Sequence, residues 1–346
     1  MNAVTFQMAG DFRYSQVDPP ELQDPQDVLV QVTETAICGS DLHLYRGHIP
    51  GLMPGTVVGH EFTGLVVAVG SGVRQFHSGD RVVGTFHVAC GICLACKRGD
   101  YHQCVHGGVL GYGMAFGNLC GVQAEYVRIP WGDVNLRKIP EGLSDEKAIF
   151  CGDILTTAFG AVKNGGIIPG ETVAVIGAGP VGQMAVMSAL VMGAAKVLVI
   201  DLIADRLAMA ETLGARAINS TSSNPVRRVF QETAGHGADL VIEAVGGSKT
   251  LELAFQLVRG GGRISAIGVT AESELKFPLM TALTRDLTFR IGLANIHRDI
   301  DQTLALVANG RVDPTIVVSH RLPLSQAAQG YQLFDQRQAT KVLLIP

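Results

Sequence analysis

The sequence carries little charge and no excess of positive charge. Only 17% of its 346 residues are charged, and 27 Lys and Arg against 31 Asp and Glu leave a net charge of −4. A nucleic-acid partner usually requires a basic face and a membrane surface a polybasic patch, so we expect neither partner. Hydrophobic residues make up 47% of the chain, which excludes a disordered polymer and predicts a large core.

A secretory signal and a disulfide framework are also lacking. The N-terminal sequence MNAVTFQMAGDFRY has no basic segment followed by an apolar core. The cysteines number seven, an odd count, and four of them are spaced as metal ligands rather than as disulfide partners. We therefore expect a cytoplasmic protein. No repeat of 20–50 residues and no low-complexity run is present.

One stretch, residues 172–195, contains no charged residue at all. Its length and hydropathy alone would suggest a membrane span. The glycine-rich sequence GAGPVG at 177–182 interrupts it, however, and divides it into a strand, a turn and a helix. We therefore expect no membrane association.

Four cysteines are concentrated in the run CGICLACKRGDYHQC, at Cys90, Cys93, Cys96 and Cys104. Four thiolates at such short gaps match the ligand set of a closed, tetrahedral zinc site. A site of this kind has no open coordination position and is structural. Any chemistry must therefore lie elsewhere in the chain.

The pattern of expected secondary structure changes near residue 156. Before it, short apolar runs at 28–37, 62–73 and 80–86 predict a β-rich, barrel-like domain, with the cysteine run (88–106) as a lobe. After it, strands alternate with helices, which predicts a parallel sheet covered on both faces. The expected strands are 172–176, 196–201, 238–246 and 262–269, and the expected helices are 180–193, 204–214 and 248–259. The tail, 294–346, begins with a helix and ends in a strand that could return to the first domain.

A nucleotide-binding turn lies between the first of these strands and the helix after it. Gly177, Gly179 and Gly182 form G-x-G-x-x-G, in which the first glycine makes the turn and the second lets the backbone approach a pyrophosphate. The third lets helix and strand pack closely, and the helix N-terminus favours the phosphates. Asp201, at the end of the next strand, can accept hydrogen bonds from the adenosine ribose and favours NAD over NADP. Arg206 could approach the same ribose and tempers that preference.

Further metal-type side chains occur in three short clusters, at 38–43 (CGSDLH), 59–61 (GHE) and 151–153 (CGD). A catalytic zinc needs three protein ligands and one open position. Cys38 and His60 are natural candidates, because a thiolate and an imidazole both suit zinc. Glu61 is a candidate for a supporting carboxylate or a transient ligand.

Taken together, these motifs resemble those of the zinc-dependent medium-chain alcohol dehydrogenases. CGSDLH, GHEFTG, the four-cysteine lobe, GAGPVG and Asp201 occur in that family's order and separation. AICGSDLH, DILTTAFGAV and EYVRIP are most similar to the bacterial formaldehyde-dehydrogenase-like branch. The chain has no room for the extra loop of the formaldehyde-dismutating members, which disfavours dismutation and favours an exchangeable cofactor.

The resemblance implies an α/β plus β architecture with two domains. A GroES-like catalytic domain (1–154 and 294–346) would be interrupted by a Rossmann domain with a doubly wound parallel sheet (155–293). It also implies two zinc ions per chain, NAD(H), and a small alcohol, aldehyde or ketone as substrate. Family members form homodimers or homotetramers.

For the catalytic zinc, the resemblance implies Cys38, His60 and a third ligand in the 151–153 cluster. The alignment of DILTTAFGAV favours Asp153, with Cys151 as the alternative. Ser40 and His43 match the family's proton relay, in which the serine passes the alcohol proton through the cofactor ribose to the histidine. Phe86 matches a substrate-pocket wall. The implied cofactor contacts are Gly177, Gly179, Pro180, Val181, Gly182, Asp201, Arg206 and Thr157.

Two other functions stay open at this point. The first is a polyol or amino-alcohol dehydrogenase of the same family, of the sorbitol or threonine type. The second is a nucleotide-binding zinc protein without catalysis, against which the intact CGSDLH, GHE and CGD clusters argue. Two zinc ions per chain would favour an enzyme, and one would favour the binding protein.

Overall fold

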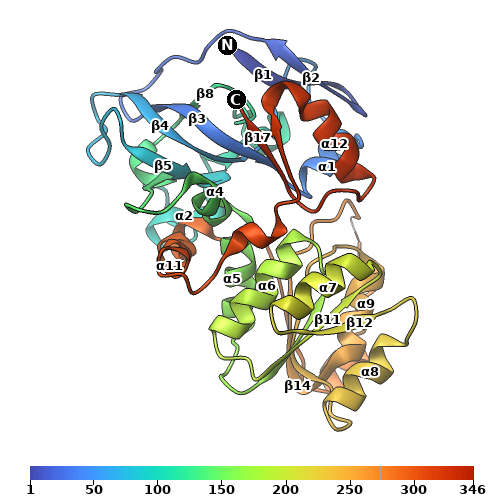
Figure 1. The fold of residues 1–346 in the computed structure, drawn as a ribbon. Coiled ribbons are helices and arrows are strands. Elements are labelled where there is room, and N and C mark those ends of the chain that lie inside the picture. Colours follow the sequence, from blue (N-terminus) through green and yellow to red (C-terminus); the bar gives the residue numbers. More distant parts are fainter. Residues whose placement is uncertain (273) are drawn as a thin grey trace. The chain divides into compact units, whose positions relative to one another are not determined.

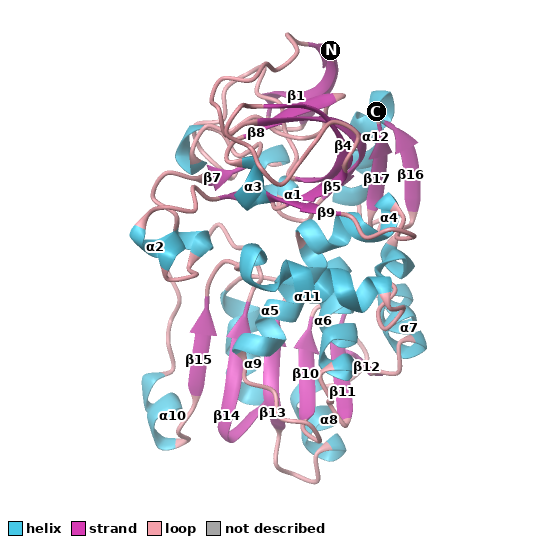
Figure 2. Ribbon diagram, turned by 90° about the vertical axis from the view of Figure 1, so that its left-hand side faces the viewer, coloured by secondary structure: helices cyan, strands magenta, loops and turns pink. Residues whose placement is uncertain are grey.

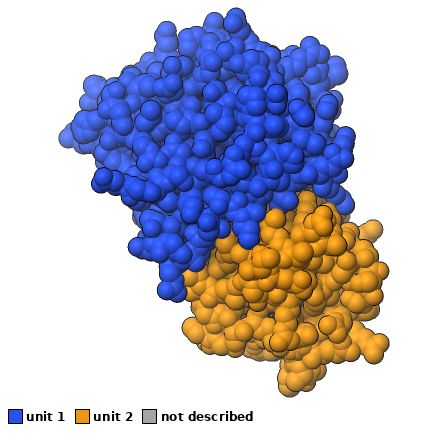
Figure 3. Space-filling view, viewed as in Figure 1, with its two compact units in different colours: residues 1–156, 295–346 blue, residues 157–294 orange. Residues whose placement is uncertain are grey.

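Two units make up the chain in the computed structural model, which describes residues 1–272 and 274–346. Unit 1 consists of Met1–Thr156 and Asn295–Pro346, and unit 2 is the intervening Thr157–Ala294 (Figure 3). Each unit has its own sheet and its own apolar cluster.

Unit 1 is built on a seven-stranded sheet in the order β16-β17-β3-β4-β5-β9, with β8 also paired to β3. The long strand β3 pairs antiparallel with β4, β8 and β17. The strands of this sheet are β3 (Val28–Ile37), β4 (Glu61–Val69), β5 (Arg81–Gly84), β8 (Tyr126–Ile129), β9 (Leu136–Lys138), β16 (His320–Pro323) and β17 (Val342–Ile345). The expected β-rich domain is therefore present, and the last strand of the chain joins it.

Shorter elements surround this sheet (Figure 1). Two small sheets pair β1 (Asn2–Met8) with β2 (Asp11–Gln16), and β6 (His87–Val88) with β7 (Gly108–Val109). The helices are α1 (Asp41–Tyr45), α2 (Leu94–Lys97), α3 (Gly132–Asn135), α4 (Asp145–Ala148), α11 (Ile296–Ala308) and α12 (Ala327–Asp335). The 3-10 turns are η1 (Tyr101–Gln103), η2 (Met114–Phe116), η3 (Ile149–Gly152), η4 (Pro314–Val317) and η5 (Leu324–Gln326).

The core of unit 1 lies on one face of the seven-stranded sheet. Val28, Val30 and Val32 alternate along β3 and are buried, as the two-residue period of a strand requires. They pack with Phe62, which has no exposed surface. A Cβ atom on Gly84 of β5 would lie only 2.1 Å from the Phe62 ring. Close packing of the strands therefore leaves no space for a side chain at Gly84.

Unit 2 contains a parallel sheet in the order β12-β11-β10-β13-β14-β15, which Figure 2 shows with the strands side by side. Its strands are β10 (Thr172–Ile176), β11 (Lys196–Asp201), β12 (Arg216–Asn219), β13 (Ala238–Glu243), β14 (Val258–Ala266) and β15 (Thr288–Ile291). Its helices are α6 (Pro180–Val191), α7 (Ala204–Thr212), α8 (Pro225–Glu232), α9 (Ser248–Leu257) and α10 (Leu279–Thr284). Helix α5 (Ile154–Asn164) contains the boundary between the units.

Continuous burial in the central strands explains why both faces of this sheet need helices. In β10 the four residues from Val173 to Ile176 are all buried, so side chains on both faces are covered. Helices α6 and α7 pack on β10, β11 and β12, while α9 packs on β13 and β14. The uncharged stretch 172–195 becomes β10, a turn and α6. Across residues 1–272 and 274–346, no helix combines the length and apolar character that a membrane crossing requires.

The close approach at Gly84 generates a stability prediction. Gly84→Ala forces a methyl group against a fully buried ring, and we expect it to lower the free energy of unfolding by about 1–3 kcal/mol. The matched control is Gly292→Ala, because Gly292 is exposed and nothing lies within 4 Å of an added Cβ. Urea or thermal unfolding of both variants measures the difference. Equal stabilities would contradict the packing described for Phe62.

Candidate functional site

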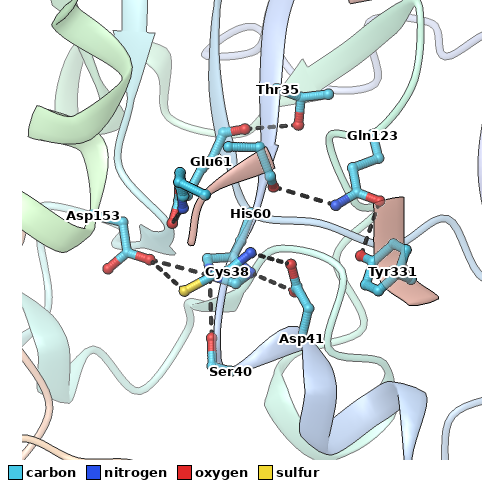
Figure 4. Close-up of polar contacts among 11 residues, drawn as sticks. Thr35, Cys38, Ser40, Asp41, His60, Glu61, Gln123, Asp153 and Tyr331 are labelled. Atoms are coloured by element: carbon cyan, nitrogen blue, oxygen red, sulfur yellow. Dashed lines mark hydrogen bonds and ion pairs between the residues drawn. The ribbon is translucent and has the colours of Figure 1, made fainter. Parts of the chain in front are cut away.

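Four side chains that could bind a metal ion converge in unit 1. They are Cys38, His60, Glu61 and Asp153. One ligand atom from each lies within 4.8 Å of the others, and all four residues are buried (Figure 4). Strand pairing brings the first three together, because Ala36 of β3 lies opposite Glu61 of β4. Cys38 therefore follows the end of β3 close to where His60 precedes β4. Asp153 comes from the bend between η3 and α5.

The distances within this group suit a single ion. The Cys38 Sγ lies 3.4 Å from Asp153 Oδ2, and the His60 Nε2 lies 3.1 Å from the same oxygen. Bond lengths of about 2.0–2.3 Å around a tetrahedral zinc ion place neighbouring ligand atoms about 3.3–3.6 Å apart. The thiol, imidazole and carboxylate therefore fit one zinc ion.

Asp41 fixes the orientation of two members of this group. Its Oδ1 lies 3.0 Å from His60 Nδ1, and its Oδ2 accepts a hydrogen bond from the Cys38 amide at 2.9 Å. A carboxylate on Nδ1 leaves Nε2, the atom beside Asp153, as the metal-binding nitrogen. Asp41 belongs to the 38–43 motif, but the motif alone assigned it no role. Its position three residues after a candidate ligand was the available signal.

Burial and mutual charge shift the titration of these side chains. Burial, followed by the charge of Asp153 and Glu61, raises the pKa of the Cys38 thiol to about 11. Burial opposes the charged form of His60, but the charge of Asp41 and the hydrogen bond that the ring donates to Asp153 outweigh it and raise the His60 pKa well above its usual value. Burial would likewise raise the pKa of Asp153, but His60 holds it at about 2. The group therefore favours a positive charge at its centre, which a divalent cation would supply.

Glu61 has a buried cationic partner, Lys341. The Lys341 Nζ lies 2.7 Å and 2.5 Å from the two Glu61 carboxylate oxygens, and neither residue has any exposed surface. Even beside this ammonium, burial raises the pKa of Glu61 to about 7. The register of β17 on β3 pairs Val342 with Ile37 and so delivers Lys341 next to Cys38. Only this long-range pairing identifies Lys341, which no motif in the sequence marks.

The two residues expected to relay a proton have different surroundings. The Ser40 Oγ lies 3.3 Å from His60 Nε2, at the edge of the candidate metal site. His43 lies on α1, with its ring 5.8 Å from that of His48. Phe86, expected as a pocket wall, places its ring 6.0 Å from the His60 ring at 74°.

Cys151, the alternative third ligand, is not among the four converging residues. It is fully buried in η3, its carbonyl accepts a hydrogen bond from Thr156 at 2.7 Å, and burial raises its pKa to about 12. The side chain that reaches Cys38 and His60 is that of Asp153.

The four closely spaced cysteines form the second converging group. Their sulfurs lie within 4.8 Å of one another, with Cys93 at 3.5 Å from Cys96 and 3.9 Å from Cys104. A tetrahedral site with Zn–S bonds of about 2.3 Å places its sulfurs about 3.8 Å apart. All four are free thiols rather than disulfides. Amide hydrogen bonds from Cys96 and Val105 lower the pKa of Cys93 to about 6, whereas burial and the neighbouring Cys93 raise the pKa of Cys96 to about 12.

In unit 2 the glycine turn joins β10 to α6. Gly177 has a φ of +95°, which favours glycine, and a Cβ on Gly182 would lie 1.8 Å from the Gly177 carbonyl oxygen. Gly179 differs, because the nearest atom to an added Cβ is the Arg206 Nη1 at 3.7 Å. Pro180 then begins α6, and Val181 follows it with partial exposure. The turn thus has an open side at Gly179 and a helix N-terminus behind it.

Asp201 is held against this turn. Its Oδ2 accepts a hydrogen bond from the Ala178 amide at 2.6 Å, and its Oδ1 accepts hydrogen bonds from Leu202 at 2.6 Å and Ile203 at 2.9 Å. The carboxylate is therefore rigidly placed next to the glycines. Thr157 lies on α5, the first helix of this unit.

Comparison with known proteins agrees with this arrangement. Residues 24–141 match the family of the alcohol dehydrogenase GroES-like domain, and residues 180–309 match the zinc-binding dehydrogenase family. A solved alcohol dehydrogenase from Thermus sp. ATN1, TADH, is 55% identical, with a TM-score of 0.97 over 100% of this chain and 99% of that one.

Curated relatives extend the same similarity. The uncharacterized zinc-type alcohol dehydrogenase-like protein AdhB of Bacillus subtilis is 37% identical over 100% of both chains. The L-threonine 3-dehydrogenase of Bacillus licheniformis is 33% identical over 93% of this chain and 92% of that protein.

The two converging groups generate a prediction about metal content. We expect two zinc ions per purified chain, and one in each of Cys38→Ser and Cys104→Ser, because each substitution removes a thiolate ligand from a different group. Cys120→Ser is the matched control, since Cys120 is exposed and belongs to neither group. Elemental analysis by plasma mass spectrometry gives the ratios. Two ions retained in both ligand variants would contradict the assignment.

Proposed function

We propose that this chain, which belongs to the zinc-dependent medium-chain alcohol dehydrogenase family, is an NAD-linked enzyme that reversibly oxidises an alcohol to an aldehyde or ketone. The observation that carries the proposal is the buried convergence of Cys38, His60 and Asp153 beside the Ser40 hydroxyl. Unit 1 would be the catalytic domain and unit 2 the coenzyme domain. The narrower similarity to the formaldehyde-dehydrogenase-like branch stays a prediction, as does a cytoplasmic location.

Cys38, His60 and Asp153 would hold the catalytic zinc ion, and the four lobe cysteines would hold the structural one. Glu61 is the fourth donor within reach and the second carboxylate, but both its oxygens are engaged by Lys341. We therefore assign Glu61 as a supporting carboxylate. To bind the metal directly, Glu61 would have to leave its ion pair with Lys341. A buried lysine left without its partner makes this exchange costly.

When bound, zinc supplies Lewis-acid polarisation of the substrate oxygen and the nicotinamide supplies the hydride acceptor. The Ser40 hydroxyl, beside His60 Nε2, is positioned to accept the proton of the substrate hydroxyl. His43, on the helix that begins at Asp41, is the residue that would finally hold this proton. Asp41 keeps the His60 ring and the Cys38 backbone fixed while this happens.

The glycine turn supports NAD as the cofactor. The open backbone at Gly179 and the N-terminus of α6 suit a pyrophosphate, with Pro180 and Val181 beside it. The carboxylate of Asp201 suits ribose hydroxyls and would repel a 2′-phosphate. Arg206 lies close enough to Gly179 to contact the same part of the cofactor, and Thr157 is assigned to the nicotinamide end.

Two other functions remain distinguishable from this one. A polyol- or threonine-type dehydrogenase uses the same chemistry on a different substrate, and a threonine dehydrogenase is among the relatives. A non-catalytic zinc protein would bind nucleotide without turning over any alcohol. The buried donor set with an adjacent hydroxyl is needed for catalysis and not for nucleotide binding, which favours an enzyme.

Turnover tests the proposal directly. NAD reduction measured across primary alcohols, secondary alcohols, polyols, threonine and formaldehyde should reveal an alcohol substrate for the wild-type protein. Cys38→Ser and Asp153→Ala should lower kcat by at least about a thousandfold, because each removes a ligand of the polarising ion. Cys151→Ala should stay within about threefold of wild type. Loss of turnover in Cys151→Ala with activity kept in Asp153→Ala would reverse the ligand assignment. The absence of turnover with every substrate would contradict the proposal that the chain is an alcohol dehydrogenase.

Cofactor preference generates a second prediction. Asp201→Ser removes the charge that repels a 2′-phosphate and should lower the ratio of kcat/KM for NAD over NADP by about tenfold or more. Asp205→Ser is the matched control, because Asp205 is exposed on α7 and makes no part of the turn. Steady-state kinetics with both cofactors gives the ratio. An unchanged ratio in Asp201→Ser would show that the carboxylate does not face the adenosine ribose.

We also propose a homodimer or homotetramer that uses one apolar face of unit 2. Leu279, Met280 and Leu283 of α10 are 69–72% exposed, and Ile291 of the neighbouring β15 is 57% exposed. Strand β15 ends the six-stranded sheet, so its outer edge has unpaired backbone groups among the described residues. Exposed apolar side chains beside an open strand edge are typical of a subunit interface.

Leu283→Asp should therefore shift the mass measured by light scattering after size exclusion towards that of a monomer, because a buried charge opposes association. Met8→Asp, which changes an exposed apolar residue of unit 1, should leave the mass unchanged. The same oligomer in both variants would contradict this interface.

A further inference from the structure

A buried carboxylate lies at the end of β13 in unit 2. Glu243 is the last residue of this strand, is only 1% exposed and pairs in register with Ile176 of β10. Gly177, where the glycine turn begins, follows Ile176 directly. Strands β10 and β13 are neighbours in the sheet although β11 and β12 separate them in the chain, so the strand order reverses between them (Figure 2). Glu243 therefore lies at the switch point of the sheet, where α/β proteins bind their ligands.

Glu243 joins two loops at this edge of the sheet. Its Oε1 accepts hydrogen bonds from the Val245 amide at 2.9 Å and the Gly246 amide at 2.8 Å, in the loop after β13. Its carbonyl oxygen accepts two more, from the Ile267 amide at 2.9 Å and the Gly268 amide at 3.1 Å, in the loop after β14. Two amide donors on one oxygen are the charge-assisted hydrogen bonds that a carboxylate makes. The side chain therefore brings a negative charge to this edge.

The other oxygen of this carboxylate has no partner. In the part of the chain that the structure describes, residues 1–272 and 274–346, no hydrogen bond reaches Glu243 Oε2. The arginines of the adjacent strand β14 are paired with other acids, Arg259 with Asp239 and Arg263 with Glu171. A buried negative charge without a countercharge is costly, and a cationic ligand that binds beside it removes part of that cost.

Close backbone packing fixes the position of the Glu243 carboxylate. A Cβ on Gly268 would lie 2.7 Å from Glu243 Oε2 and 2.1 Å from the Gly246 amide nitrogen. A Cβ on Gly177 would lie 2.5 Å from the Val245 side chain, so the loop after β13 also packs on the glycine turn. Val245 itself is 50% exposed. The loop thus reaches from the buried carboxylate to the surface that borders the turn.

The places of Asp201 and the glycine turn decide which half of NAD would approach this carboxylate. Asp201, at the end of β11, suits the adenosine ribose, and the turn after β10 suits the pyrophosphate. Strands β11 and β13 flank β10 on opposite sides. The nicotinamide half would therefore extend over the carboxyl ends of β13 and β14. Its ring carries a positive charge when oxidised and none when reduced.

We propose that the unpaired carboxylate of Glu243 makes this site prefer the oxidised cofactor to the reduced one, by supplying a countercharge to the nicotinamide ring. This inference rests on the proposed NAD-linked function and assigns the residue that sets the balance between the two cofactor states. The attraction requires charge on both groups, and burial of the carboxylate strengthens it. Bound NADH lacks this attraction, which favours its exchange for NAD⁺ after an alcohol has been oxidised.

Cofactor binding without turnover tests the inference. Isothermal titration calorimetry of the zinc-loaded protein, with no alcohol present, gives the Kd values for NAD⁺ and NADH. Glu243→Gln keeps an oxygen that can accept from the two amides and removes the charge. The Kd for NAD⁺ should therefore rise about fivefold or more, while that for NADH stays within about twofold. Glu252→Gln is the matched control, because it removes the same charge from an exposed position on α9 and should change neither Kd.

A purely structural role for Glu243 would raise both Kd values together. An unchanged ratio of the two Kd values in Glu243→Gln would therefore overturn the inference while leaving an NAD-linked enzyme in place. If thermal unfolding shows that this variant does not fold, Glu243→Met decides by the same ratio, because methionine has a similar length and no charge. Failure of the wild type to bind either NAD⁺ or NADH would instead refute the proposed NAD-linked function, and this inference with it.

Discussion

Unit 1 depends on compensating the charge of four buried ionisable side chains that lie around one point. A thiol, an imidazole and two carboxylates lie within 4.8 Å of one another, in surroundings where unpaired charge costs several kcal/mol per group. Such a set is stable only with compensating positive charge. Lys341 supplies it for Glu61, and a divalent cation would supply it for the other three. That positive charge therefore links segments that lie far apart in the chain, as Lys341 does with Glu61.

The rest of unit 1 keeps those segments in place. The β3–β4 pairing sets Cys38 beside His60, and the pairing of β17 with β3 brings Lys341 to the same point. To one side of His60, the Tyr331 hydroxyl donates to Gln123 at 3.0 Å, and the Gln123 amide donates to the Ala36 carbonyl at 3.3 Å (Figure 4). The C-terminal segment of the chain therefore supports ligands from its first sixty residues. The three candidate ligands lie just beyond the ends of these elements, and paired strands and buried hydrogen bonds hold those ends in place.

Unit 2 depends on a different constraint, the close approach of two backbone segments at the glycine turn. Gly182 must touch Gly177, and Gly179 must stay open, so that a helix can begin directly behind a strand. Asp201 adds the hydrogen bond to Ala178 that joins the end of β11 to the turn. Residues 172–195, which form β10, the turn and α6, contain no charged residue because β10 is covered on both faces. At the strand ends, backbone amides hold Asp201, whereas Asp239 pairs with Arg259.

Much of this could be predicted from local sequence. The strands β3, β10 and β11 begin and end where their apolar runs do, and the cysteine lobe and glycine turn follow from spacing alone, because neighbours in sequence are neighbours in space. The strands β12 and β15 were not predicted because each has only four residues. The helix α8 was not predicted either, although it is amphipathic and capped by Asn224. Boundaries also moved, as in β14, which begins at Val258 rather than at residue 262.

Tertiary structure alone decided the contacts between residues that lie far apart in the chain. The sequence offered both Cys151 and Asp153, and only the fold shows which side chain reaches His60 across a separation of 93 residues. Lys341 carried no signal, because a lysine before a strand is ordinary until strand pairing places it beside a buried carboxylate. The sequence by itself determined the chemical groups and the local turns that present them. Burial and strand register, which depend on the whole chain, determined which of those groups share one site.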